Sequence, residues 1–225
     1  MSVFQTIEVP CPSCQTSVKF ELVHSVNAAR RPDLRAAILE RSFQRQNCSS
    51  CGFTFRVEPE FTYLDVTRKQ FFAVYPASKL EQCNQLEPKA KDSYDRAYGP
   101  DSVGKTLGQG MLARIVFGWA GLTEKLIAAD NRIDDRTLEV AKIAVMRSMG
   151  EVKLGGDREF RLLGVTPENL AFGWLRGSNL DEEIGVPREL LGEIEAQPSD
   201  WAGLMKEVAG TMFVDYRRGM YAAAA

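Results

Sequence analysis

Short stretches in which hydrophobic and polar residues alternate dominate the first third of the chain. They are residues 16–24, 53–57, 61–66 and 71–75. A two-residue period is typical of half-buried β-strands, because successive side chains of a strand point to opposite faces of the sheet. The polar residues 67–69 separate the last two stretches, which are therefore predicted to form a hairpin.

Hydrophobic residues at every third or fourth position predict helices in other parts of the chain. The first helix begins at Pro32, because proline is favoured in the first turn, and it lies between the first two strands. Further helices are predicted for residues 103–119, 119–131, 135–149, 187–196 and 199–208. Asp134 and Ser199 are the expected N-caps of two of them.

Strand patterns return in the last third of the chain. Residues 160–162 and 170–175 flank the turn residues 166–169 and predict a second hairpin. Residues 178–185 are expected to form a polar loop, and residues 211–216 a closing strand.

Two Cys-x-x-Cys pairs, Cys11 with Cys14 and Cys48 with Cys51, stand before and after the first predicted helix. Such a turn brings two sulfurs to one ion, and two turns complete the tetrahedral four-thiolate shell of a structural zinc. Gly52 follows the second pair and can take the φ > 0 conformation that points backbone N–H groups at sulfur. The 33 residues between the pairs exceed the usual spacing of about 15–20, which predicts an expanded zinc ribbon with a helical insert.

Disulfides, a redox-active Cys-x-x-Cys and an iron–sulfur cluster are the alternatives for these cysteines. The first six residues lack the basic and apolar regions of a signal peptide, so we expect a cytoplasmic, reducing location in which disulfides are rare. Thioredoxin-like motifs occur singly. Zinc is therefore favoured, and a shell filled by four thiolates leaves no open position for catalysis. Cys83 stands alone and is assigned no role.

Several segments of the first half carry a family resemblance. They are Cys11-Pro12-Ser13-Cys14, Ser25-Val26-Asn27-Ala28, Cys48-x-x-Cys51-Gly52 and Phe61-Thr62-Tyr63-Leu64-Asp65. With the helical insert, they make residues 9–75 resemble the bacterial CpXC domain family, and a thinner similarity extends to residues 122–149. Ser49 departs from the proline common at that position. The resemblance implies that the four cysteines are metal ligands, and it implies no particular activity.

The composition is ordinary for a globular protein of one or two domains, since 44% of the 225 residues are hydrophobic and 26% are charged. No apolar run approaches the ~18–20 residues that span a bilayer, so we expect no membrane segment. The net charge of −2 argues against general binding to nucleic acid. His24 is the single histidine, which excludes much of histidine-dependent catalysis. At the end of an apolar strand face, it is expected to be partly buried and bonded to backbone.

The first predicted helix lies in the most basic stretch of the chain. The arginines of this stretch are Arg30, Arg31, Arg35, Arg41 and Arg45. Zinc ribbons can present such faces to phosphates, so nucleic-acid binding through Arg31, Arg35 and Arg41 is an alternative function. A solvated helix face is the interpretation we favour, because no exposed aromatic residues interleave with the arginines.

Residues 99–106, Gly-Pro-Asp-Ser-Val-Gly-Lys-Thr, fit the G-x-x-x-x-G-K-[ST] pattern of a P-loop. In a P-loop, backbone N–H groups, a lysine and a hydroxyl bind a nucleotide and its magnesium, and Lys105 and Thr106 would supply the last two. A buried strand must lead into such a loop, whereas residues 89–98 are hydrophilic. Nucleotide binding by Gly99 to Thr106 therefore stays an alternative to a simple loop and helix start.

Acidic residues gather in the two helices predicted for residues 119–149. They are Glu124, Asp130, Asp134, Asp135 and Glu139. A pair of carboxylates would suit general acid–base catalysis. Acidic residues near helix starts usually cap the helix and stay solvated, which is the interpretation we favour.

Together these patterns predict an α+β protein. Residues 1–76 form the expanded zinc ribbon, residues 77–102 a polar linker or exposed helix, and residues 103–221 helices with a second small antiparallel β region. The predicted function is a structural zinc-binding module that presents a surface to a macromolecular partner, protein rather than nucleic acid. We infer no reaction, no catalytic residue and no organic cofactor.

Overall fold

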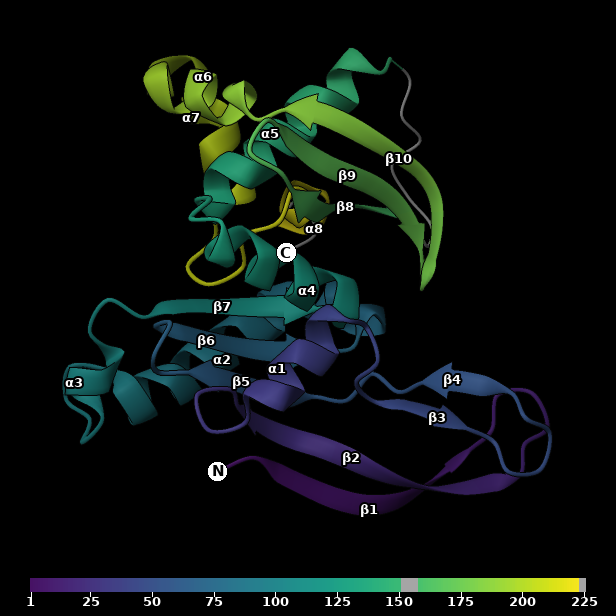
Figure 1. The fold of residues 1–225 in the computed structure, drawn as a ribbon. Helices are drawn as coiled ribbons and strands as arrows, with labels where there is room; N and C mark the ends of the chain where they lie inside the picture. Colours follow the sequence, from purple (N-terminus) through teal and green to yellow (C-terminus); the bar gives the residue numbers. More distant parts are fainter. Residues whose placement is uncertain (151–157, 223–225) are drawn as a thin grey trace. The chain divides into compact units, whose positions relative to one another are not determined.

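The computed structural model describes residues 1–150 and 158–222. Helices and antiparallel strands occur together (Figure 1), which confirms the α+β class. The chain divides into two compact units, Met1–Trp119 and Ala120–Ala225. In the described part of the chain, no helix is both long and apolar enough to cross a membrane.

A five-stranded sheet organises the first unit. Its strands are β1 (Val3–Pro10), β2 (Ser17–Asn27), β5 (Phe61–Asp65), β6 (Gln70–Tyr75) and β7 (Leu112–Phe117), in the order β1-β2-β5-β6-β7. β1 pairs with β2, and β5 with β6, in antiparallel fashion, so the predicted hairpin of β5 and β6 is confirmed. β5 lies parallel to β2, and β7 parallel to β6. Parallel neighbours require crossover connections, and the chain between them supplies the helices of this unit.

Helices lie on both faces of this sheet (Figure 1). α1 (Pro32–Leu39) begins at the predicted proline and buries its apolar side. α2 (Cys83–Tyr98), which follows the short 3-10 helix η1 (Ala77–Gln82), packs on the face that carries Phe71, whose ring centroid lies 5.1 Å from that of Tyr94. The next residue of β6 points to the opposite face, as the alternation of a strand requires.

The register of β1 against β2 corrects the expectation for His24. It shifts between Val3, which pairs with Ser25, and Phe4, which pairs with Val23, so His24 is the extra residue of a bulge in β2. Val23 is buried, and His24 is exposed with its Nε2 2.9 Å from Gln5 Oε1. The prediction of a partly buried, backbone-bonded histidine is therefore wrong.

The helix predicted for residues 103–119 is also wrong. The structure has a single turn, α3 (Lys105–Gly108), followed by the strand β7. Gly108 is the last residue of α3, and Gly110, which lies between the helix and the strand, has φ +69°, a conformation that does not continue a helix. The residues of β7 are a short apolar run, and periodicity alone does not distinguish a buried strand from a buried helix.

The second unit combines helices with a three-stranded antiparallel sheet. Its elements are α4 (Gly118–Asp130), which begins just before the unit boundary, α5 (Asp135–Ser148), β8 (Arg158–Val165), β9 (Asn169–Arg176), β10 (Asn179–Pro187), α6 (Glu189–Ala196), α7 (Pro198–Val208) and α8 (Arg218–Ala222). The strand order is β10-β9-β8, so the predicted hairpin of β8 and β9 is confirmed. Asp134 caps α5 as predicted, since its Oδ1 accepts hydrogen bonds from the backbone N–H groups of Arg136 and Thr137. Apolar residues of α5 to α7 and of the sheet form one core.

Three expectations for this unit are wrong. Residues 178–185 are not a loop, because most of them belong to β10, an edge strand whose mostly exposed residues give no hydrophobic signal. Residues 211–216 form no strand beyond an isolated bridge between Ala209 and Val214. Ser199 is not the cap of α7, which begins at Pro198 with Gln197 in the cap position.

Candidate metal centre

The two Cys-x-x-Cys turns have the same backbone geometry. In the first, the N–H of Gln15 donates to the carbonyl of Cys11 at 2.9 Å, and in the second the N–H of Gly52 donates to the carbonyl of Cys48 at 2.8 Å. Both residues that close the turns have positive φ, 61° for Gln15 and 73° for Gly52. The conformation expected for Gly52 is thus found, and the first turn adopts it without glycine.

Backbone bonds also close each loop behind its first cysteine. The N–H of Cys11 donates to the carbonyl of Thr16, and the N–H of Cys48 to that of Phe53, both at 2.9 Å. The first loop joins β1 to β2, and the second joins β3 (Arg45–Asn47) to β4 (Thr54–Arg56). Two hairpins therefore hold the sulfurs, and we call residues 9–18 and 47–55 together the knuckle end of the first unit.

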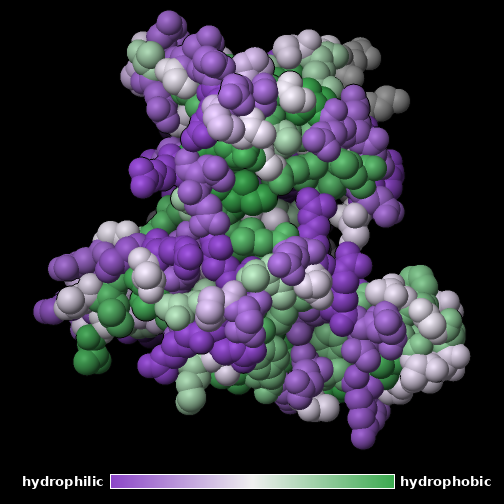
Figure 2. All heavy atoms as spheres, viewed as in Figure 1, coloured by the Kyte–Doolittle hydropathy of each residue, from purple (hydrophilic) through white to green (hydrophobic). Residues whose placement is uncertain are grey.

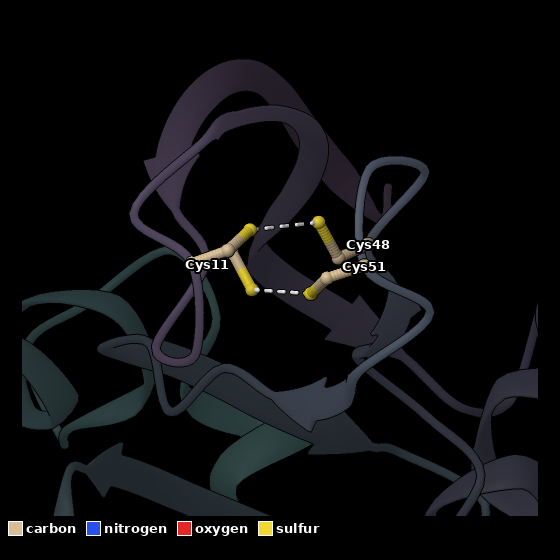
Figure 3. Close-up of side chains that lie close together, drawn as sticks. Cys11, Cys48 and Cys51 are labelled. Atoms are coloured by element: carbon tan, nitrogen blue, oxygen red, sulfur yellow. Dashed lines mark hydrogen bonds between the residues drawn. The ribbon is translucent and has the colours of Figure 1, made fainter.

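The four sulfurs converge. Cys11 Sγ lies 3.7 Å from Cys51 Sγ, Cys14 Sγ lies 3.6 Å from Cys48 Sγ, and all four lie within 4.8 Å of one another. Figure 3 shows Cys11 facing Cys48 and Cys51 across the gap between the two loops. Sulfurs bound at about 2.3 Å to a tetrahedral zinc would stand about 3.8 Å apart. The residues present therefore fit a four-thiolate metal site.

The first cysteine of each pair is buried and the second is exposed. Cys11 and Cys48 form a small core with Val18, against which Val9 and Phe55 pack. Cys14 and Cys51 are exposed. The small apolar area enclosed here indicates that hydrophobic burial contributes little to holding the two hairpins together.

The pKa values of two thiols diverge in this cluster. Hydrogen bonds with the side chain and the backbone of Thr16 lower the pKa of Cys14 to about 6. A hydrogen bond with the backbone of Phe53 lowers the pKa of Cys51, but the neighbouring thiols, Cys14 first, and desolvation raise it more, to about 11. Cys14 thus favours the thiolate that a metal requires, whereas Cys51 gives up a proton on metal binding.

Comparison with known proteins places this site in a family. The family model described as CpXC protein matches residues 9–142, more than half of the 225-residue chain. The chain belongs to the CpXC family. The part that matches CpXC contains all four cysteines and ends within α5. No curated protein and no solved structure matches this CpXC chain.

The P-loop-like segment of the CpXC chain does not have P-loop geometry. Helix α2, not a strand, leads into residues 99–106, and the helix that follows has a single turn. The N–H groups of Ser102 and Lys105 bond to carbonyls of the same loop, at 3.0 and 3.3 Å. They are therefore not arranged to bind one phosphate together.

The arginines of the first helix do not share one exposed face. Arg35 is only 8% exposed, and Arg31 forms an ion pair with Asp33 in which Nη2 and Oδ2 are 2.6 Å apart. Arg41 follows the helix in a left-handed conformation, with φ 60°. Arg31, Arg35 and Arg41 therefore do not form the basic surface that the nucleic-acid hypothesis assumed.

The acidic residues of the second unit are placed differently from expectation. Glu124, Asp135 and Glu139 are at most 4% exposed, so they are not solvated. They belong to a buried charge cluster contributed by α4, α5, β8 and the segment before α8. Its members are Glu124, Lys125, Asp135, Glu139, Lys142, Glu159, Arg161, Asp215 and Arg217.

The sequence patterns did not predict this buried charge cluster, although one feature of the sequence indicates it. Glu124 and Lys125 stand between Leu122 and Leu126, which are fully buried residues of the same helix. A charged pair amid such a run is rarely buried unless it is paired with other charges. Because the side chains of the cluster are at most 13% exposed, they are closed to a substrate in this structure.

Proposed function

We propose that the four cysteines bind one zinc ion whose role is structural. The convergence of four sulfurs from two loops of the same geometry carries this proposal. Thiolates are soft ligands that suit zinc and iron–sulfur centres, and a tetrahedral shell from two Cys-x-x-Cys turns is typical of structural zinc. With all four positions filled by thiolates, no position remains for a substrate or a catalytic water.

The zinc stabilises the knuckle end. β3 and β4 have three residues each, and the core beneath the turns is small. Metal binding to a site that is not formed in the unfolded chain adds its binding free energy directly to folding. Removal of the metal is therefore expected to unfold the β3–β4 hairpin first.

We further propose that the knuckle end contacts a macromolecular partner, and that this partner is a protein. Residues 9–18 and 47–55 contain no charged residue, and Phe53 in the second loop is 46% exposed. Figure 2 shows white and green atoms gathered at this end of the first unit. The cores of protein interfaces are depleted in charge and enriched in aromatic residues, whereas nucleic acid favours basic surfaces. A bacterial cytoplasm, where thiols stay reduced, suits such a site.

Phe53→Asp tests the interaction. Val103→Asp is the matched control, because Val103 is also exposed but lies in the loop before α3. Chemical crosslinking in a bacterial extract, followed by mass spectrometry, is expected to detect a protein partner with the wild type and with V103D but not with F53D. Zinc content should be equal in all three. Crosslinks that survive F53D, or a partner that is nucleic acid alone, would contradict the proposed protein interface.

A further inference from the structure

Two arginines stand directly opposite each other beside the knuckle end. In the antiparallel pair β3–β4, Arg45 is the register partner of Arg56. Directly opposed residues place their side chains on the same face of a hairpin, about 5 Å apart at Cβ, and like charges in that position destabilise the pair. An arrangement of this kind calls for a compensating negative charge.

Backbone carbonyls of the turn at residues 41–43 hold both guanidinium groups. Arg45 Nε donates to the carbonyl of Arg41 at 2.6 Å, and Arg56 Nε donates to the carbonyl of Phe43 at 2.8 Å. Arg56 also lies over the ring of Trp119, with its Cζ 4.3 Å from the centroid. The side chains are therefore ordered through Nε, which leaves their Nη groups for another acceptor.

The structure offers these arginines no carboxylate partner. Among the described residues, no ion pair joins an acidic side chain to Arg41, Arg45 or Arg56. Arg56 Nη2 is buried and has no hydrogen-bond partner there, and burial together with the charges of Arg45 and Arg41 lowers the pKa of Arg56 to about 10, despite the opposing charge of Glu58.

Glu58 is already engaged with backbone. Its carboxylate accepts hydrogen bonds from the N–H groups of Ala77 at 2.8 Å and Trp119 at 3.4 Å. It therefore binds the start of η1 and of α4 and does not neutralise the arginines directly.

We propose that Arg45 and Arg56 form a binding site for a phosphate-type oxyanion. The planar fork of a guanidinium matches two oxygens of such a group, and charge-assisted hydrogen bonds to it are strong. Free phosphate and the phosphate of an ester share this chemistry. The site rests on the metal-held β3–β4 hairpin of the proposed function.

Calorimetric titration of the zinc-loaded chain with inorganic phosphate, at constant ionic strength in chloride, tests the site. We expect one anion per chain at millimolar concentration, and affinity at least about tenfold weaker in Arg45→Gln. Arg96→Gln is the control, because Arg96 is an exposed arginine of α2 that pairs with Asp92. Arg56→Lys keeps the charge but loses the fork, and it should also weaken binding.

The outcomes distinguish a small-molecule phosphate from a polynucleotide phosphate, and both of these from the absence of a site. Equal affinity for inorganic phosphate and glycerol phosphate would support a small-molecule ligand, and much tighter binding of an oligothymidylate, lost in R45Q, would assign the site to a polynucleotide phosphate. No binding, or equal weakening in R96Q and R45Q, would overturn the site. Metal content measured on the same samples shows separately whether the zinc assignment holds. An unfolding temperature that phosphate raises in the wild type and not in R45Q would be independent support.

Discussion

Lys142 Nζ lies 3.0 Å from each carboxylate oxygen of Glu124, and neither side chain is exposed. The same nitrogen lies 2.7 Å from Glu139 Oε2. Moving a charge into a protein interior costs several kcal/mol, so each of these ions depends on its partners. The lysine therefore joins α4 to α5 through carboxylates that would otherwise be buried without compensation.

The cluster extends past the part of the chain that matches CpXC. Arg161 Nη1 lies 2.7 Å from Glu124 Oε2 and 3.0 Å from Asp215 Oδ2, and the family match ends at residue 142. Strand β8 and the segment before α8, which lie outside the match, thus supply charged partners to a cluster whose other members lie in α4 and α5. We infer that the described residues 120–150 and 158–222 fold as one unit, and that the end of the match is no domain boundary.

Lys142→Met is expected to destabilise the second unit by roughly 3–5 kcal/mol, because Glu124 and Glu139 lose a buried partner. Equilibrium urea unfolding measures the change. Lys206→Met is the matched control, since Lys206 is exposed on α7, and it should change stability by less than about 0.5 kcal/mol. If the two variants were equally stable, the buried cluster would contribute nothing to the fold.

Acid should destabilise the second unit through Glu124 and Asp215. Burial alone would raise the pKa of Glu124, but Lys142 and Arg161 lower it overall, and Arg217 and Arg161 likewise hold the pKa of Asp215 well below its usual range. A carboxyl with a lowered pKa in the folded state stabilises above its unfolded pKa, about 4, and loses that contribution as pH falls through the folded value. Unfolding free energy should therefore be level above about pH 5 and fall below about pH 4. Asp215→Asn should reduce the slope, and stability that rose between pH 5 and pH 3 would refute this account.

The matching turns predict that glycine is favoured over a residue with a Cβ at both equivalent positions. Gln15 has positive φ, which costs a residue with a Cβ about 1 kcal/mol, so Gln15→Gly should stabilise the metal-loaded first unit by about 0.5–1 kcal/mol. Gly52→Ala should destabilise it by a similar amount through the backbone alone, since a Cβ there meets no atom within 4 Å. Thermal unfolding of the zinc-loaded variants measures both changes. Destabilisation by Q15G would show that the side chain of Gln15, whose Nε2 lies 3.5 Å from the carbonyl of Pro12, matters more than its φ.

The convergence of the four cysteines could be predicted because its determinants are local. A Cys-x-x-Cys turn is encoded in four residues, and the convergence of two such turns follows from the demands of a tetrahedral ion. The hairpin of β5 and β6 could also be predicted, since hydrophobic and polar residues alternate in both strands and a polar turn joins them. The exposure of His24 could not be predicted, because the bulge that this residue forms in β2 depends on the pairing with β1.

Long-range partners explain most of what could not be predicted. Glu124 was expected to be solvated, and its ion-pair partner Arg161, which also pairs with Asp215, follows 37 residues later, at a separation that no local pattern covers. Strand β7 could not be distinguished from a helix, because a short buried apolar run suits either structure until its sheet neighbour is known.

The most direct test of the metal centre is native mass spectrometry of the untagged chain, with and without a nucleotide mixture, beside Cys14→Ser and Cys51→Ser. We expect the mass of one zinc ion on the wild type, no nucleotide adduct, and loss of the zinc together with unfolding of the knuckle end in each variant. A wild-type chain without metal, or a serine variant that kept both its metal and its fold, would contradict the four-thiolate site.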